Sequence, residues 1–185
     1  MGTMIQNGSD VVSFLKRQHE QIKTLFNEVT SASGDDKARA FYALRRLLAV
    51  HETAEEEIVH PAARRTLTNG AAIVDERLRE ENEAKKALTE LESVPIGAPD
   101  FDVKLRVLAT AVIAHAEAEE QNEFAPLASK LDPTRLERMR KAAELAEAIA
   151  PTRPHPGIES SIANMLVGPF ASMMDRARDA LTGKS

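Results

Sequence analysis

The sequence predicts an all-α protein, an antiparallel up-down-up-down four-helix bundle with a C-terminal helical extension. Apolar side chains recur every three or four residues along four segments of comparable length, which is the spacing of one helical face. Glycine and proline account for only 8 and 9 of the 185 residues, and 4% of the residues are aromatic, which disfavours turn-rich β folds. The connections between the segments are short, so consecutive helices should be antiparallel.

The first two predicted helices are separated by a turn at residues 33–36. Ser9 and Asp10 offer an N-cap for the first helix, which runs to about residue 32. The second helix ends near Asn69 and Gly70. The inward-facing stripes of the two helices are Val12, Leu15, His19, Ile22, Phe26 and Val29, then Ala40, Leu44, Leu47, His51, Glu55, Ile58 and Ala62.

The third predicted helix stops at the breaker-rich loop of residues 95–99, and the fourth begins after Asp100 or Asp102 and continues to about residue 131. Ionisable side chains again interrupt their apolar stripes. These stripes are Val74, Leu78, Glu81, Ala84, Leu88 and Leu91, then Leu105, Leu108, Val112, His115, Glu119 and Pro126. Residues 10–131 are therefore assigned to the bundle.

Residues 132–185 are assigned to the C-terminal helical extension. Asp132 and Pro133 supply an N-cap and a first helical residue for a shorter fifth helix, which a proline-rich stretch at residues 151–157 breaks. We expect His155, in that stretch, to belong to a rigid turn. The tail beyond it is predicted to be helical and to dock on the bundle or on another subunit through Phe170, Met173 and Leu181. We therefore expect a monomer or a homodimer.

Composition excludes several classes of function. The formal net charge is -5, from 29 acidic and 24 basic residues, so we expect no nucleic-acid partner. The chain has no cysteine, which leaves histidines and carboxylates as the metal ligands available to it. No uncharged stretch approaches the roughly 18 residues of a membrane helix. The first residues do not resemble a signal sequence, so we expect a cytoplasmic protein with no membrane partner.

A duplicated motif carries the chemistry. His51 and His115 are each followed four residues later by a glutamate, Glu55 and Glu119, and then by a second glutamate and a proline. Residues four apart lie on one helical face with their Cβ atoms roughly 5–6 Å apart, so an imidazole and a carboxylate from the same helix can reach one metal site. Both pairs lie on the apolar stripes, where charge is costly unless it is paired or bound to metal.

An internal repeat adds two further residues to this set. When the first helix is shifted by 62 positions, Val12 falls on Val74, Phe26 falls on Leu88 and His19 falls on Glu81. The predicted metal ligands are His19, His51, Glu55, Glu81, His115 and Glu119. Three imidazoles and three carboxylates suit two iron or manganese ions bridged by carboxylates, with positions left for solvent or small ligands.

These motifs resemble the hemerythrin-like family, the HHE cation-binding domain, over about residues 10 to 131. The family pattern is a His on the first helix, His-x3-Glu on the second and fourth, and a His on the third. The resemblance implies a non-heme di-iron site with an oxo or hydroxo bridge and small oxygen or nitrogen species as ligands. Glu81 stands where the family usually has His, and this departure argues against reversible oxygen carriage.

Other polar residues near the motif have open roles. A one-residue rotation of the third helix would bring Glu80 to the site instead of Glu81. The flanking residues Glu52, Glu56, Glu120 and Glu123 are either surface charges, which we favour, or acceptors for imidazole N–H groups. His60 is nine residues from His51, half a turn out of phase, so we expect it to be exposed or to cap a helix rather than to bind metal.

We predict that the protein decomposes hydrogen peroxide in the manner of a catalase without heme. An anionic carboxylate in place of a neutral imidazole stabilises the ferric state, which suits peroxide turnover better than oxygen carriage. The alternative is a module that binds or senses oxygen, nitric oxide or iron without turnover. A third hypothesis is a metal-free bundle whose inward charges are merely paired.

Overall fold

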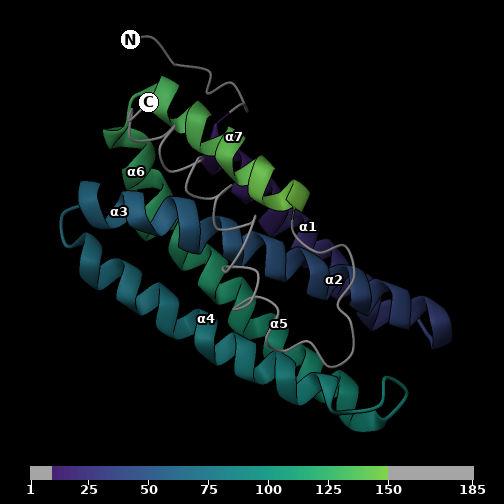
Figure 1. Cartoon of the computed structure of the whole chain (residues 1–185). Coiled ribbons are helices and arrows are strands. Elements are labelled where there is room, and N and C mark those ends of the chain that lie inside the picture. Colours follow the sequence, from purple (N-terminus) through teal and green to yellow (C-terminus); the bar gives the residue numbers. More distant parts are fainter. Residues whose placement is uncertain (1–9, 150–185) are drawn as a thin grey trace, which may run out of the picture.

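The computed structural model describes residues 10–149, and within this range the fold is all-α, as predicted (Figure 1). In chain order the elements are α1 (Val11–Ser31), α2 (Gly34–Ala54), η1 (Glu55–Val59), α3 (His60–Thr66), α4 (Gly70–Glu92), α5 (Pro99–Glu119), η2 (Glu120–Phe124), α6 (Ala125–Lys130) and α7 (Pro133–Ile149). The expectations for His155 and for the tail face of Phe170, Met173 and Leu181 lie outside the described residues.

Four long helical segments close into the predicted antiparallel bundle. Helix α1 packs along α2, α4 packs along α5, α5 returns to α1, and α3 contacts α4 (Figure 1). The connections at residues 32–33, 67–69 and 93–98 are short, so each segment reverses direction against its neighbour. Among residues 10–149, no helix is long and apolar enough to serve as a membrane span.

The helix starts follow from capping chemistry. The Ser13 N–H donates to the Asp10 carboxylate at 2.7 Å, which fixes the start of α1 where the sequence predicts it. The Arg135 N–H donates to Asp132 at 3.0 Å in the same way at the start of α7. At the α3–α4 turn, a Cβ added to Gly70 would lie 2.3 Å from the carbonyl oxygen of Ala63, so only glycine lets the two backbones approach this closely.

The second and fourth predicted helices each contain a π turn that the sequence pattern does not show. In η1 the His60 N–H donates to the Glu55 carbonyl, and in η2 the Ala125 N–H donates to the Glu120 carbonyl, five residues back in each case. Each π turn ends two residues before a proline, Pro61 or Pro126, which has no N–H to donate. The helices do not end at these prolines. They continue beyond them as α3 and α6.

Two apolar clusters fill the bundle, and a polar layer separates them. One cluster contains residues from α1 through α7, among them Leu15, Val59, Phe124 and Met139. The other contains Ile22, Leu48 and their neighbours, and lies nearer the connections at residues 32–33 and 93–98.

Helix α7 lies across α1 and α2 (Figure 1) and adds Leu136, Met139 and Ala143 to the first cluster. The described part of the predicted extension thus shares the core of the bundle. The division at residue 131 stays a prediction.

Candidate metal centre

The six residues singled out in the sequence lie together in the polar layer. Helix α1 contributes His19, α2 contributes His51, η1 begins with Glu55, α4 contributes Glu81, and α5 contributes His115 and Glu119. Glu55 and Glu119 are 0% exposed and Glu81 is 2% exposed, so three carboxylates are buried between apolar clusters. Of the two neighbouring glutamates on α4, Glu81 belongs to the donor groups of this layer and Glu80 does not.

Donor atoms in the layer form two groups that share two carboxylates. One group contains His19, His51, Glu55 and Glu119, and the other contains Glu55, Glu81, His115 and Glu119, with all donor atoms of a group within 4.8 Å of one another. Each group could hold a metal ion. Because Glu55 and Glu119 belong to both groups, the arrangement places two carboxylates between two adjacent cation positions.

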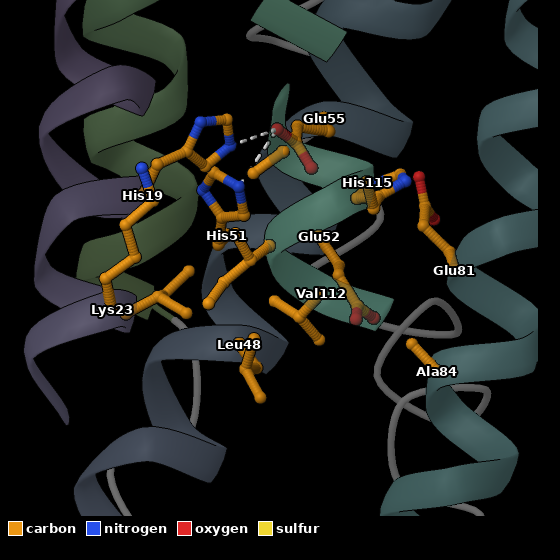
Figure 2. A pocket seen from close by; sticks show the side chains of 13 residues that line it. His19, Lys23, Leu48, His51, Glu52, Glu55, Glu81, Ala84, Val112 and His115 are labelled. Atoms are coloured by element: carbon orange, nitrogen blue, oxygen red, sulfur yellow. Dashed lines mark ion pairs between the residues drawn. The ribbon is translucent and has the colours of Figure 1, made fainter. Parts of the chain in front are cut away.

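The Nε2 atoms of the imidazoles face these shared carboxylates. His51 Nε2 lies 3.0 Å from Glu55 Oε1, and His19 Nε2 lies 3.8 Å from the same oxygen (Figure 2). His19 Nε2 and His115 Nε2 each lie 3.4 Å from Glu119 Oε2. Glu55 lies beside the His19 and His51 rings, whereas His115 and Glu81 face each other on the other side of the site (Figure 2).

The opposite nitrogen of each imidazole is held by an outer acceptor. His51 Nδ1 lies 2.9 Å from Gln18 Oε1, His19 Nδ1 lies 2.9 Å from Glu120 Oε1, and His115 Nδ1 lies 2.9 Å from Glu80 Oε2. An acceptor at Nδ1 fixes the tautomer that leaves the Nε2 lone pair facing inward, as in metal sites whose histidines are held by a second layer of groups.

Sequence reasoning missed some of these outer partners and misjudged others. Gln18 adjoins a predicted ligand but was not singled out. Our preference for surface charge was wrong for Glu120 and Glu123, which accept from imidazoles, and Glu123 is 0% exposed. Lys85, on the outside of the bundle, pairs with Glu56 at 2.6 Å and with Glu52 at 3.3 Å, so these two acids bind a lysine.

The expectation that His60 is exposed is wrong. It is 2% exposed, its Nε2 lies 2.8 Å from Glu81 Oε1, and its Nδ1 lies 2.9 Å from Glu123 Oε1. Nine α-helical steps of about 100° would place His60 roughly 180° from His51. The π turn η1 takes up one extra residue, which leaves about eight effective steps and an angle of roughly 80°. Pro61, next to His60, is the one sequence signal that could have revealed this change of face.

Burial and mutual charge set the pKa values of the layer. Burial lowers the pKa of His19, but the nearby carboxylates of Glu119 and Glu55 outweigh it and raise that pKa to about 10. Burial raises the pKa of Glu55, but the charges of His51 and His19 hold it well below its usual range. Burial and repulsion from Glu55 raise the pKa of Glu119 well above normal, and burial raises the pKa of Glu81 to about 7. The acids and bases of the layer therefore compete for protons, as groups that bind a cation do.

Several buried atoms in this layer have no hydrogen-bond partner within the described part of the chain. They are His19 Nε2, His115 Nε2, one oxygen of Glu81 and Glu123, and both oxygens of Glu55 and Glu119. A buried carboxylate without a donor is costly, often by several kcal/mol, unless a cation neutralises it. The donor set of imidazoles and carboxylates suits iron or manganese, so the residues fit a pair of such ions.

A small pocket adjoins the centre. Its volume is about 20 Å³, and its walls include His19, His51, Glu55, Glu81 and His115 together with Ile22, Leu48, Ala84 and Val112 (Figure 2). A space of this size holds about one water molecule. Substrates larger than a few atoms would have to displace side chains to enter.

Comparisons with known proteins agree with this geometry. The family described as Hemerythrin HHE cation binding domain matches residues 10–128. A protein named DNA nickase from Nostoc sp. strain PCC 7120 is 26% identical over 144 residues, which are 75% of this chain but 40% of the relative, so the chain spans well under half of that protein.

The crystal structure of a Hemerythrin HHE cation binding domain-containing protein from Mycobacterium kansasii shares the fold. Its TM-score is 0.69 at 19% identity, covering 91% of this chain and 98% of that one. The family match extends over more than half of the chain and includes all six residues of the two donor groups. The chain therefore belongs to the hemerythrin HHE cation-binding domain family.

Proposed function

We propose that the centre holds two iron ions. His19 and His51 would bind one ion, His115 and Glu81 would bind the other, and Glu55 and Glu119 would bridge them. The observation that carries this proposal is the sharing of Glu55 and Glu119 by both donor groups. The carboxylate oxygens of this pair, which have no donor among the described residues, support it.

We further propose that hydrogen peroxide is the substrate and that the protein disproportionates it. One peroxide takes up two electrons and two protons and becomes two water molecules, and a second peroxide gives up two electrons and two protons and becomes oxygen. The reaction needs no external reductant. Two irons held by these residues would supply the two-electron redox chemistry that both half-reactions need.

The surrounding side chains would orient the site and limit access to it. Gln18, Glu120 and Glu80 hold the imidazole rings at Nδ1, so the Nε2 atoms do not turn away. The apolar residues Ile22 and Val112 line the pocket of about 20 Å³, a space for about one water-sized molecule, so we expect bulky organic hydroperoxides to be excluded. Glu81 favours turnover over oxygen carriage, because an anionic ligand stabilises the ferric state.

The alternative is binding or sensing of oxygen, nitric oxide or iron without turnover. The small pocket suits diatomic gases as well as it suits peroxide. We keep the sequence-based proposal that the protein acts in the cytoplasm, as a monomer or homodimer. We do not propose a role on DNA, because the net charge is -5 and the chain spans 40% of the DNA nickase that it matches.

The test is peroxide decay measured together with oxygen release in iron-loaded protein. We expect oxygen at half the amount of peroxide consumed, and no such activity in the His51→Ala/His115→Ala variant, which loses one imidazole from each donor group. Binding of oxygen or nitric oxide without peroxide decay would favour the alternative. Equal peroxide decay in the parent and in the double variant would contradict both peroxide turnover at this centre and the alternative of binding without turnover.

Glu81→His separates turnover from binding. The change removes one negative charge from the centre, so the midpoint potential should rise and the reduced protein should survive longer in air. We expect peroxide decay to slow by about 10-fold or more, the size of effect seen when groups around metal sites change. Unchanged potential, autoxidation and peroxide decay would show that Glu81 has no part in the chemistry.

A further inference from the structure

We propose that His60 is a fourth histidine ligand of the centre and binds the ion assigned to His115 and Glu81. The inference rests on the proposed di-iron function and adds a residue that the HHE motif does not contain. It reverses the expectation from the sequence pattern, which placed His60 on the outside of the bundle.

His60 occupies the part of the polar layer next to Glu81. Its side chain is 3% exposed, and its Nε2 lies 2.8 Å from Glu81 Oε1. Donor atoms of His60, Glu119 and Glu123 all lie within 4.8 Å of one another, which connects His60 to a carboxylate of both main donor groups. His60 is the first residue of α3 and follows His51 along the same helical run, beyond the π turn η1.

One distance fits two ligands of the same ion. Two donor atoms at right angles around an ion, with bonds of about 2.1 Å, lie about 3.0 Å apart. The separation of 2.8 Å between His60 Nε2 and Glu81 Oε1 is close to this value, as is the 3.0 Å between His51 Nε2 and Glu55 Oε1. His60 Nε2 and Glu81 Oε1 are therefore spaced as two neighbouring donors to one ion would be.

The orientation of the His60 ring repeats that of the other three histidines. Its Nδ1 lies 2.9 Å from Glu123 Oε1, as the Nδ1 atoms of His19, His51 and His115 lie 2.9 Å from their own outer acceptors. Glu123 is 0% exposed, and burying a carboxylate there is costly unless it accepts a hydrogen bond from a partner such as His60. All four rings are thus held with Nε2 inward, the tautomer that a metal ligand requires.

With His60, the two ion positions would have the same number of imidazole ligands. Without it, the first position has two imidazoles, from His19 and His51, whereas the second has only His115. With it, each position has two imidazoles and the shared pair of carboxylates. Helix α4 offers the carboxylate of Glu81 where the family usually has an imidazole, and His60, at the start of α3, would supply an imidazole to the same ion.

A purely positioning role for His60 is the competing explanation. In that case the ring would only donate a hydrogen bond to Glu81 and never contact the ion. The variant His60→Gln separates the two roles, because its amide N–H₂ group can still donate to Glu81 but binds metal weakly. His155→Gln is the matched control, because it makes the same change at the one remaining histidine of the chain.

The experiment uses full-length protein loaded with Co²⁺, which shifts the proton signals of ligating imidazoles far outside the ordinary range. Each ligating ring contributes one exchangeable Nδ1–H signal, and the buried acceptors slow its exchange with water. We expect four such signals in the parent and in His155→Gln, and three in His60→Gln. A titration of His60→Gln should show one Co²⁺ bound as in the parent and the second at least about 10-fold more weakly.

Three signals in the parent, with two Co²⁺ bound, would overturn the His60 assignment and leave the proposed function standing. So would unchanged signals in His60→Gln, or a loss in His155→Gln alone. Binding of fewer than two Co²⁺ and fewer than two irons by the parent would instead overturn the proposed function and this inference with it. If His60→Gln fails to fold by circular dichroism, the count in the parent still decides.

Discussion

Each histidine of the polar layer has one nitrogen directed at the centre and one held from outside. The outer acceptors come from α1, α4 and η2, and two of them, Gln18 and Glu123, are buried. A ring held in this way cannot rotate without breaking a buried hydrogen bond. The site is therefore organised before any ion arrives.

Gln18→Leu tests this organisation. The change keeps a side chain of similar size but leaves His51 Nδ1 without its acceptor, so the ring loses its fixed tautomer. We expect Co²⁺ affinity to fall by about 10- to 100-fold, with helicity unchanged. Titration followed by the visible Co²⁺ spectrum would measure it.

The matched control is Gln21→Leu, which makes the same change at an exposed position of the same helix. Its Co²⁺ affinity should equal that of the parent. Equal affinities in all three proteins would mean that the bond between Gln18 and His51 does not organise the site.

The sequence was sufficient to bring out the six central residues because both His-x3-Glu pairs lie on apolar stripes, where charge is unusual. The outer partners were harder to predict. Gln18, Glu80 and Glu120 each adjoin a predicted ligand, but nothing in a single sequence separates such a residue from an ordinary surface group. Their roles depend on how neighbouring helices rotate, and this rotation follows from packing between helices.

The two π turns determine which side chains that follow α2 and α5 face the centre. A helix of uniform pitch would carry His60 to the outside, and η1 brings it to the inside instead. The 3.6-residue pattern predicts the helix as a whole but assumes constant pitch, so it fails beyond the first interruption. The expectation for His60 was wrong for this reason, although the ends of the helical segments were predicted closely.

The α3–α4 connection keeps this geometry in place through Gly70. Gly70→Ala would push a methyl group against the Ala63 carbonyl, which its Cβ would approach to 2.3 Å. We expect a loss of about 1–3 kcal/mol in unfolding free energy, the usual cost of overpacking. Urea denaturation of the metal-free protein would measure the change.

Gly97→Ala provides the comparison, since no heavy atom lies within 4 Å of the added Cβ. Its unfolding free energy should stay within about 1 kcal/mol of the parent. If the two alanine variants had the same unfolding free energy, the close approach of α3 and α4 at Gly70 would not require glycine.

The bundle as a whole contains a charged layer between two apolar clusters, with α7 closing one end. Without an ion, protons partly neutralise this layer. The pKa of His19 is raised to about 10 by its carboxylate neighbours despite burial, and the pKa of His60 is raised to about 11 in the same way by Glu123 and Glu81. Metal ions must displace these protons, because an imidazole binds metal only when its Nε2 is free.

Metal binding should therefore release protons and strengthen as the pH rises. The metal-free protein keeps His19 protonated at all pH values below about 10, and the metal-bound form cannot, so higher pH favours the bound form. Between about pH 6 and 8, affinity for Co²⁺ should rise by about tenfold per pH unit for each proton released. Calorimetry in buffers of different ionisation enthalpy would count the protons, and a count of zero at neutral pH would contradict this description of the layer.

The proposed function requires two ions that share Glu55 and Glu119, and iron analysis with an optical spectrum of the purified protein tests this directly. After iron-replete expression, we expect about two irons per chain and the charge-transfer bands of oxo- or hydroxo-bridged ferric ions. Less than about half an iron per chain, with no such bands, would show that the inward charges are merely paired and would contradict a di-iron centre.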